Sequence, residues 1–269
     1  MTDSLERLEA ILPGLGSVAI ALSGGVDSMT LATVAHRLLG RDRVRMMHAV
    51  SPAVPPPATA RVREIAAAEA WDLQILDAGE FADPRYRANP YNRCFFCKTN
   101  LYGAIAGRTD RQVLSGTNVD DLGEYRPGLQ AAREHGVRHP FVEADMRKAD
   151  VRAAARRLGL GAVAELPASP CLSSRVETGI PIDPATLVFA HEVEQFVTAE
   201  IAPATVRCRV RPSAVVVELD RESLDAMASE ARRAMEEAIG AMRPAATRGL
   251  PVTFAAYRTG SAFVDRSRP

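Results

Sequence analysis

The sequence lacks an excess of charge of either sign, since 33 Lys and Arg residues balance 33 Asp and Glu residues among its 269. A neutral chain has no basic field to hold nucleic acid non-specifically, which argues against a nucleic-acid partner. No run approaches the roughly 20 apolar residues of a membrane-spanning helix, so no membrane partner is expected. The N-terminal residues lack the basic start and apolar core of a signal peptide, so we expect a cytoplasmic protein.

Cysteine is also scarce, with four residues in the chain. In a cytoplasmic protein so few cysteines are more typical of thiols, metal ligands or catalytic groups than of disulfides. The rest of the composition, with 47% hydrophobic and 25% charged residues, is that of an ordinary globular protein. The length allows one sizeable core and a second, smaller domain.

Short apolar runs alternate with helical patterns through the first two thirds of the chain. This alternation predicts a doubly wound parallel sheet with helices on both faces and ligands at the carboxyl ends of its strands. Beyond the long connection at 160–184 the pattern changes to a helix at 184–201, a strand pair at 205–210 and 215–219, and a helix at 221–239. We therefore expect an α/β domain over 1–180 and a smaller α+β domain over 181–269.

The strongest motif follows the first predicted strand and opens the first predicted helix. It reads Ser23-Gly24-Gly25-Val26-Asp27-Ser28. Two glycines let the backbone turn sharply and approach a ligand, and the helix N-terminus presents free N–H groups to an anion. A carboxylate does not suit bare phosphates unless a cation mediates, so Asp27 is interpreted as a Mg²⁺-side residue. Neither the dinucleotide fingerprint nor the Walker A pattern is present.

Three cysteines form two further signals. Cys94 and Cys97 lie in Arg93-Cys94-Phe95-Phe96-Cys97-Lys98, and Cys171 lies in Pro170-Cys171-Leu172-Ser173-Ser174-Arg175. A lone C-x-x-C suits zinc, an iron–sulfur cluster or a redox pair, and the missing fourth ligand disfavours structural zinc. Neighbouring cations favour thiolates. Three cysteines are the right number for a cluster with one open iron.

A fourth signal, Gly116-Thr117-Asn118-Val119-Asp120-Asp121, also follows a predicted strand. We expect it at the same sheet edge as the glycine loop, because parallel strands end together. Asp120 and Asp121 are candidate Mg²⁺ ligands, and Arg126 is a candidate anion contact. The same residues are equally consistent with an acidic turn exposed to solvent and without a ligand.

Taken in their order along the chain, at residues 23, 94, 116 and 171, the four signals resemble the LarE family of ATP-dependent sulfur transferases, within the PP-loop (adenine nucleotide alpha hydrolase-like) superfamily. The resemblance runs from about Ser17 to Arg211. It implies that ATP adenylates a carboxylate of a pyridinium dicarboxylic acid mononucleotide, with release of pyrophosphate. Sulfur then displaces AMP to give a thiocarboxylate on the route to the nickel-pincer nucleotide cofactor. A homo-oligomer is implied, and a sulfur-donor protein is a candidate partner.

The resemblance also implies roles for individual residues. With all three cysteines present, a [4Fe-4S] cluster on Cys94, Cys97 and Cys171 is favoured as the sulfur source over sacrifice of Cys171 itself. Lys98 and Arg175 resemble contacts to ATP or substrate phosphate beside the catalytic Cys171. Arg207, Arg209 and Glu194 resemble residues that bind substrate phosphate or metal, with Glu192 and the Arg209–Arg211 spacing as alternatives. Val216 stands where the family has an arginine, and Cys208 is interpreted as structural.

Three other interpretations remain open. An ammonia-using PP-loop synthetase would need no cysteine set. A tRNA thiolase would use cysteines but normally has a basic RNA-binding element, which the neutral charge does not indicate. A nucleotide sensor without catalysis would release no pyrophosphate with any carboxylate substrate.

Overall fold

The computed structural model of the chain describes residues 3–123 and 125–264. They form two compact units. The first contains the chain up to Asp83 together with Asn92–Ser169, and the second contains Pro84–Tyr91 together with the chain from Pro170. The domain boundary expected near residue 180, and the substrate-binding and oligomerisation roles expected beyond it, stay predictions.

The first unit contains a parallel sheet in the order β3-β2-β1-β4. Its strands are β1 (Val18–Ala21), β2 (Val44–Ala49), β3 (Asp72–Leu76) and β4 (Gln112–Leu114). The chain runs from β1 outward to β3 and then returns to place β4 on the other side of β1. The order of strands therefore reverses between β1 and β4, and the carboxyl ends of these two strands are where such sheets bind ligands.

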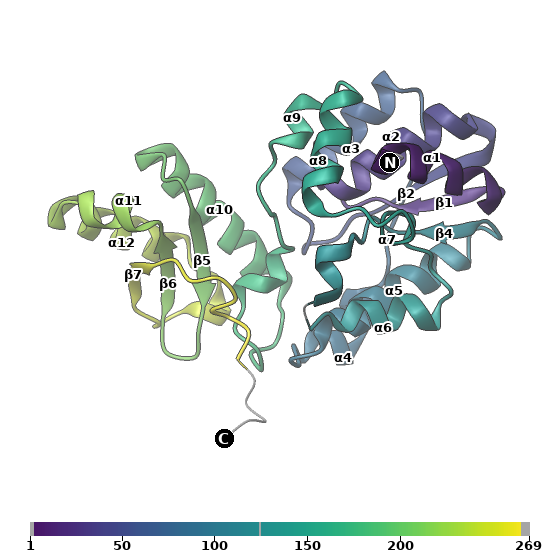
Figure 1. The fold of residues 1–269 in the computed structure, drawn as a ribbon. Helices are drawn as coiled ribbons and strands as arrows, with labels where there is room; N and C mark the ends of the chain where they lie inside the picture. Colours follow the sequence, from purple (N-terminus) through teal and green to yellow (C-terminus); the bar gives the residue numbers. More distant parts are fainter. Residues whose placement is uncertain (1–2, 124, 265–269) are drawn as a thin grey trace. The chain divides into compact units, whose positions relative to one another are not determined.

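Helices cover both faces of this sheet (Figure 1), which confirms the doubly wound class. Val18 and Ile20 of β1 pack into a core with α1, α2, α3 and α8, while Ala19 and Ala21 pack into a second core with α5 and α6. Side chains alternate between the faces of a strand, so a continuous apolar run fits a strand buried on both sides. The helices are α1 (Ser4–Ile11), α2 (Val26–Leu39), α3 (Pro56–Ala68), α5 (Arg93–Ala106), α6 (Pro127–Glu134), α7 (Pro140–Glu143), α8 (Lys148–Arg157) and α9 (Gly161–Ala164).

The second unit contains a three-stranded sheet in the order β5-β6-β7. Its elements are α4 (Pro84–Arg87), α10 (Pro184–Ile201), β5 (Val206–Val210), β6 (Val215–Leu219), α11 (Arg221–Ala226), α12 (Ser229–Met242) and β7 (Val252–Ala256). β5 and β6 are antiparallel, as the predicted strand pair requires, whereas β7 was not predicted and adds to β6 in parallel. The single helix expected at 221–239 is wrong, because the chain is extended at Met227 and starts α12 afresh.

Segment Pro84–Tyr91 is attached to the second unit through Asn89. This side chain is fully buried and donates from Nδ2 to the carbonyls of Glu177 and Ile180, both at 2.9 Å. Gly179 N–H donates to the Asn89 carbonyl, also at 2.9 Å. Asn89 has a φ of +53°, a conformation that asparagine tolerates better than most residues. An asparagine at position 89, five residues before Cys94, is thus explained by packing within the second unit.

No helix in the described ranges combines the length and the hydropathy of a membrane-crossing segment.

Candidate active site

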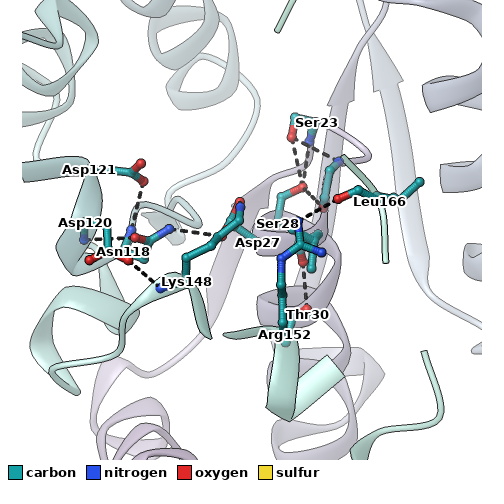
Figure 2. A network of polar contacts seen from close by, with 12 residues as sticks. Ser23, Asp27, Ser28, Thr30, Asn118, Asp120, Asp121, Lys148, Arg152 and Leu166 are labelled. Carbon is teal, nitrogen blue, oxygen red and sulfur yellow. Dashed lines mark hydrogen bonds and ion pairs between the residues drawn. The ribbon is translucent and has the colours of Figure 1, made fainter. Parts of the chain in front are cut away.

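The loop 23–28 joins β1 to α2 at the carboxyl edge of the first sheet (Figure 2). Gly24 has a φ of +80°, and a Cβ there would lie 2.8 Å from the Ala58 carbonyl oxygen, so only glycine fits. Ser28 Oγ accepts the Ser23 N–H at 3.1 Å and lies 3.0 Å from Ser23 Oγ. The loop therefore curls over the first turn of α2, whose first N–H groups have no partner within the helix.

The loop after β4 lies against this loop, so the predicted sharing of one sheet edge is confirmed. A Cβ on Gly116 would lie 2.8 Å from the backbone N of Ser28, which explains why a glycine is needed where the two loops meet. Asn118 Nδ2 donates to Asp27 Oδ1 at 3.1 Å. Its backbone N–H donates to Asp121 Oδ2, also at 3.1 Å. Asn118 thereby links Asp27 and Asp121, two of the three carboxylates for which a Mg²⁺ role is predicted (Figure 2).

Lys148 is a site residue that the sequence analysis missed. Its Nζ lies 2.5 Å from Asp27 Oδ2, and Figure 2 shows the side chain reaching across from the start of α8. The two side chains are 36% and 25% exposed, so the pair is open to solvent rather than locked in the core. Along the chain Lys148 is only the first residue of a helix, which is uninformative until the fold brings α8 beside α2.

Asp120 holds the start of α8 in place. Its Oδ2 accepts the backbone N–H of Lys148 at 2.9 Å, and its Oδ1 pairs with Arg147 Nη1 at 3.0 Å. A carboxylate at a helix N-terminus is favourable because it satisfies a free N–H and the helix dipole. Among the described residues, no three His, Cys, Asp or Glu side chains gather as a metal-ion group. The predicted Mg²⁺ roles of Asp27, Asp120 and Asp121 stay predictions.

Cys94, Cys97 and Lys98 occupy the first turns of α5. The i, i+3 spacing puts the two half-buried thiols on neighbouring positions of one helix face. Lys98 Nζ lies 5.8 Å from the centre of the Tyr102 ring, and a Cβ on Gly128 would lie 3.0 Å from Lys98 Cγ. The packing of α6 on α5 thus brings the region after Arg126 close to Lys98. Arg126 pairs with Asp121 Oδ1 at 2.9 Å.

In the second unit, Arg175 and Glu194 form a two-pronged ion pair with two N···O distances of 2.9 Å. The two side chains are 4% and 9% exposed. Glu194 Oε1 also accepts the backbone N–H of Cys208 at 3.0 Å. Burial, aided by the nearby Glu194 carboxylate, raises the pKa of the Cys208 thiol far above its usual range, which keeps it protonated. This environment fits the structural role expected for Cys208.

A second buried network lies on the same sheet. Arg209 Nε and Arg211 Nη2 donate to the two oxygens of Glu218 at 3.0 and 2.9 Å, and Ser261 Oγ donates to Oε1 at 2.7 Å. Arg207 lies half-buried on the same strand, and burial together with the neighbouring Arg175 lowers the pKa of its guanidinium. Cationic side chains outnumber the acidic ones in these two networks, so this region suits an anion.

The predicted site residues are therefore divided between the units. The first unit holds Ser23, Gly24, Gly25, Val26, Asp27, Ser28, Cys94, Cys97, Lys98, Gly116, Thr117, Asn118, Asp121 and Arg126, and the second holds Cys171, Arg175, Glu194, Arg207 and Arg209. Cys171 is exposed and directly precedes the 3-10 turn Leu172–Arg175. The roles assigned to these residues stay predictions.

A parallel sheet with a Gly-Gly loop at its point of strand reversal defines an α/β protein of the PP-loop class. No protein-family model matches the chain. The chain is 30% identical over 216 residues to the pyridinium-3,5-bisthiocarboxylic acid mononucleotide synthase of Lactiplantibacillus plantarum, covering 79% of this chain and 78% of the relative. The chain therefore belongs to the LarE family, the family of that synthase.

Two uncharacterized proteins are also similar to the chain. One, from Synechocystis sp., is 40% identical over 187 residues, covering 66% of this chain and 68% of the relative. The other, from Methanocaldococcus jannaschii, is 29% identical over 136 residues, covering 49% of this chain and 52% of the relative.

Proposed function

We propose that this protein is an ATP-dependent sulfur transferase that acts on pyridinium-3,5-dicarboxylic acid mononucleotide. It adenylates a carboxylate, releases pyrophosphate and converts the acyl adenylate to a thiocarboxylate. The main support is the 30% identity, over 79% of the chain, to a synthase whose name states the corresponding bisthiocarboxylic product. The second support is the glycine loop at the strand-reversal point of the first unit, where a PP-loop protein holds ATP phosphates.

The phosphates of ATP would bind over the loop 23–28. The first N–H groups of α2 point out of the helix end, and Ser23 and Ser28 add hydroxyl donors. Asp27 and Asp121, with Asp120 as a further candidate, are the carboxylates that would hold Mg²⁺, since hard cations prefer such oxygens. When bound, Mg²⁺ neutralises phosphate charge and stabilises the leaving pyrophosphate. Lys148 adds a cation that can turn from Asp27 to a phosphate oxygen.

The substrate carboxylate then attacks the α-phosphate, the bond to the bridging oxygen breaks, and pyrophosphate departs on the loop. Lys98 is proposed to stabilise the charge that develops at the α-phosphate. The substrate phosphate is proposed to bind Arg207 and Arg209 in the cation-rich second unit, with Arg175 as a further contact and Glu194 as a substrate or metal contact. Arg126 of the first unit is proposed separately as an anion contact for the substrate. Asp27 and Lys148, at the sheet edge where the phosphates would bind, are in contact with each other.

Cys94, Cys97 and Cys171 are proposed to supply the sulfur site. Three thiols suit a [4Fe-4S] cluster, because three ligands leave one iron open, and Cys94 and Cys97 have the helical spacing to bind one metal group. When bound, the cluster provides a sulfide for the acyl carbon, so that turnover does not consume the protein. The alternative is that Cys171 attacks with its own thiolate and later loses its sulfur. Its exposure favours access for either role.

The test is ATP-dependent pyrophosphate release and thiocarboxylate formation with the mononucleotide substrate, under anaerobic conditions. Iron and acid-labile sulfide per chain are measured on the same preparations. Wild type is expected to hold about four irons per chain if the cluster is present. Cys94→Ser, Cys97→Ser and Cys171→Ser are expected to lose iron and thiocarboxylate formation while keeping pyrophosphate release. Cys208→Ala is the matched control and is expected to keep its iron.

Other outcomes separate the alternatives. Iron-free protein whose Cys171 peptide loses sulfur during turnover indicates sacrificial donation. Full product formation with ammonia in all three cysteine variants indicates a synthetase, and sulfur transfer only to RNA indicates a thiolase. Absence of pyrophosphate release with any carboxylate contradicts the proposed function and favours a nucleotide sensor.

A further inference from the structure

Arg61 forms a hydrogen bond to the glycine loop but is not one of the residues proposed to touch ATP. It lies in the second turn of α3 and donates from Nη1 to the carbonyl oxygen of Gly24 at 2.7 Å. The bond has a cationic donor, which makes it stronger than one between neutral groups. Arg61 therefore holds one peptide group of the loop in a chosen orientation.

That peptide group has little within itself to restrict its rotation. It joins Gly24 to Gly25, and neither residue has a Cβ to restrict its backbone. The two groups of a trans peptide point in opposite directions. With the Gly24 carbonyl held by Arg61, the Gly25 N–H must point to the other side, where Ser23 Oγ accepts it at 3.4 Å. If the peptide rotated, a carbonyl oxygen would face the anion site instead of an N–H.

Two further contacts keep α3 close to the loop. His48 Nδ1 lies 2.7 Å from the Leu22 carbonyl oxygen, and its Nε2 lies 2.9 Å from Thr59 Oγ1 on α3. A carbonyl can only accept, so His48 carries its proton on Nδ1 and Thr59 donates to Nε2. The Ala58 carbonyl lies directly against Gly24. These contacts fix the position of α3 relative to the loop, so the Arg61 side chain starts from a fixed point.

We infer that Arg61 is a positioning residue for the anion-binding loop: it acts through the Gly24 carbonyl to keep the Gly25 N–H on the opposite side of the peptide, where a phosphate oxygen would replace the long 3.4 Å bond to Ser23 Oγ. This inference rests on the proposed binding of ATP at residues 23–28. It adds to that proposal a residue that none of the four motifs contains. It also assigns α3 a function beyond covering the sheet.

The experiment measures binding of Mg²⁺-pyrophosphate and of adenosine to the full chain by calorimetry, with thermal unfolding recorded for each variant. Arg61→Gln is compared with Arg63→Gln, a change of the exposed arginine two residues along the same helix. We expect Arg61→Gln to weaken pyrophosphate binding about tenfold to a hundredfold, as expected for loss of a hydrogen bond to a charged group. Adenosine binding is expected to stay unchanged. Arg61→Lys retains a cationic donor and is expected to lose less pyrophosphate affinity than Arg61→Gln.

Three results would overturn the inference. Pyrophosphate binding by Arg61→Gln that equals binding by Arg63→Gln shows that the loop does not need Arg61. A parallel loss of pyrophosphate binding, adenosine binding and thermal stability shows that Arg61 only supports the fold. Wild-type protein that binds neither pyrophosphate nor ATP rejects the proposed function itself, and the inference with it, which distinguishes this failure from the other two.

Discussion

The charged networks of the two units differ in exposure and in the number of partners. In the first unit, Asp27 and Lys148 are 25% and 36% exposed and meet at the open carboxyl edge of the sheet. In the second unit, Arg175 and Glu194 are 4% and 9% exposed, and both oxygens of Glu194 accept hydrogen bonds. The charged side chains at the sheet edge of the first unit can therefore exchange partners, whereas those of the second unit already use most of their hydrogen-bonding groups on one another.

This difference separates two uses of charge. A buried ion pair is strongly destabilised when one partner is removed, since the other is left without compensation in a medium of low dielectric constant. A half-exposed pair contributes little to stability because water screens it, so its partners can turn to a ligand at low cost. We therefore expect substitutions in the second unit to act first on folding and substitutions at the edge of the first sheet to act on catalysis.

The largest effect is expected for Glu194→Gln. The change keeps the shape of the side chain but leaves the buried Arg175 guanidinium without a carboxylate, so the free energy of unfolding should fall by about 3–5 kcal/mol. Urea-induced unfolding measures this difference. Glu192→Gln, an exposed position on the same helix, is the control and should change it by less than about 0.5 kcal/mol. Equal stability of the two variants would contradict the expectation that the buried charges of the second unit act mainly on folding.

Lys148→Gln tests the opposite side of the comparison. It should lower the rate of ATP-dependent pyrophosphate release about 10²–10³-fold, the usual result of removing one group that stabilises charge in the transition state. The free energy of unfolding should change by less than about 1 kcal/mol, because the pair with Asp27 is partly solvated. Arg147→Gln, the preceding residue, serves as the control and should retain activity. A stability loss as large as that of Glu194→Gln would contradict the comparison.

A graded effect, rather than the loss of one interaction, is expected in the pH dependence of the first unit. Burial lowers the pKa values of His48 and His139, so below about pH 6.5 the unfolded chain binds protons that the folded chain does not. The free energy of unfolding should therefore fall as the pH falls from 7 to 5, by at most about 1.4 kcal/mol per pH unit for each histidine.

His48→Asn isolates the contribution of one histidine, because the amide can still donate to the Leu22 carbonyl without titrating. Unfolding measured at intervals from pH 8 to pH 5 should show a shallower slope than wild type, and the two proteins should differ by a constant amount above pH 7. A slope identical to that of wild type would mean that protonation of His48 does not lower the free energy of unfolding, which would contradict the prediction.

Patterns of neighbouring residues were sufficient to predict much of the fold and of the candidate site. The strand–glycine–helix order around Ser23 and Asp27 follows from neighbouring residues and was confirmed. The expectation that Gly116 lies at the same sheet edge follows from the parallel direction of the strands and was also confirmed. Lys148 and Arg61 were missed for the same reason that β7 was missed. Their importance depends on which elements pack beside them, and no spacing along the chain records that.

The amino-acid sequence by itself determined the class of fold, the family and the candidate residues of the loops, because hydrophobic periodicity and glycine requirements act over a few neighbouring residues. Only the tertiary structure decided that Lys148 pairs with Asp27, that Glu194 is bonded to Arg175 and Cys208, and that Arg61 holds the Gly24 carbonyl. These contacts join residues 121 positions apart for Lys148 and Asp27, 19 and 14 for Glu194 and its two partners, and 37 for Arg61 and Gly24. Their partners are chosen by packing of whole helices and strands, which single-residue preferences do not encode.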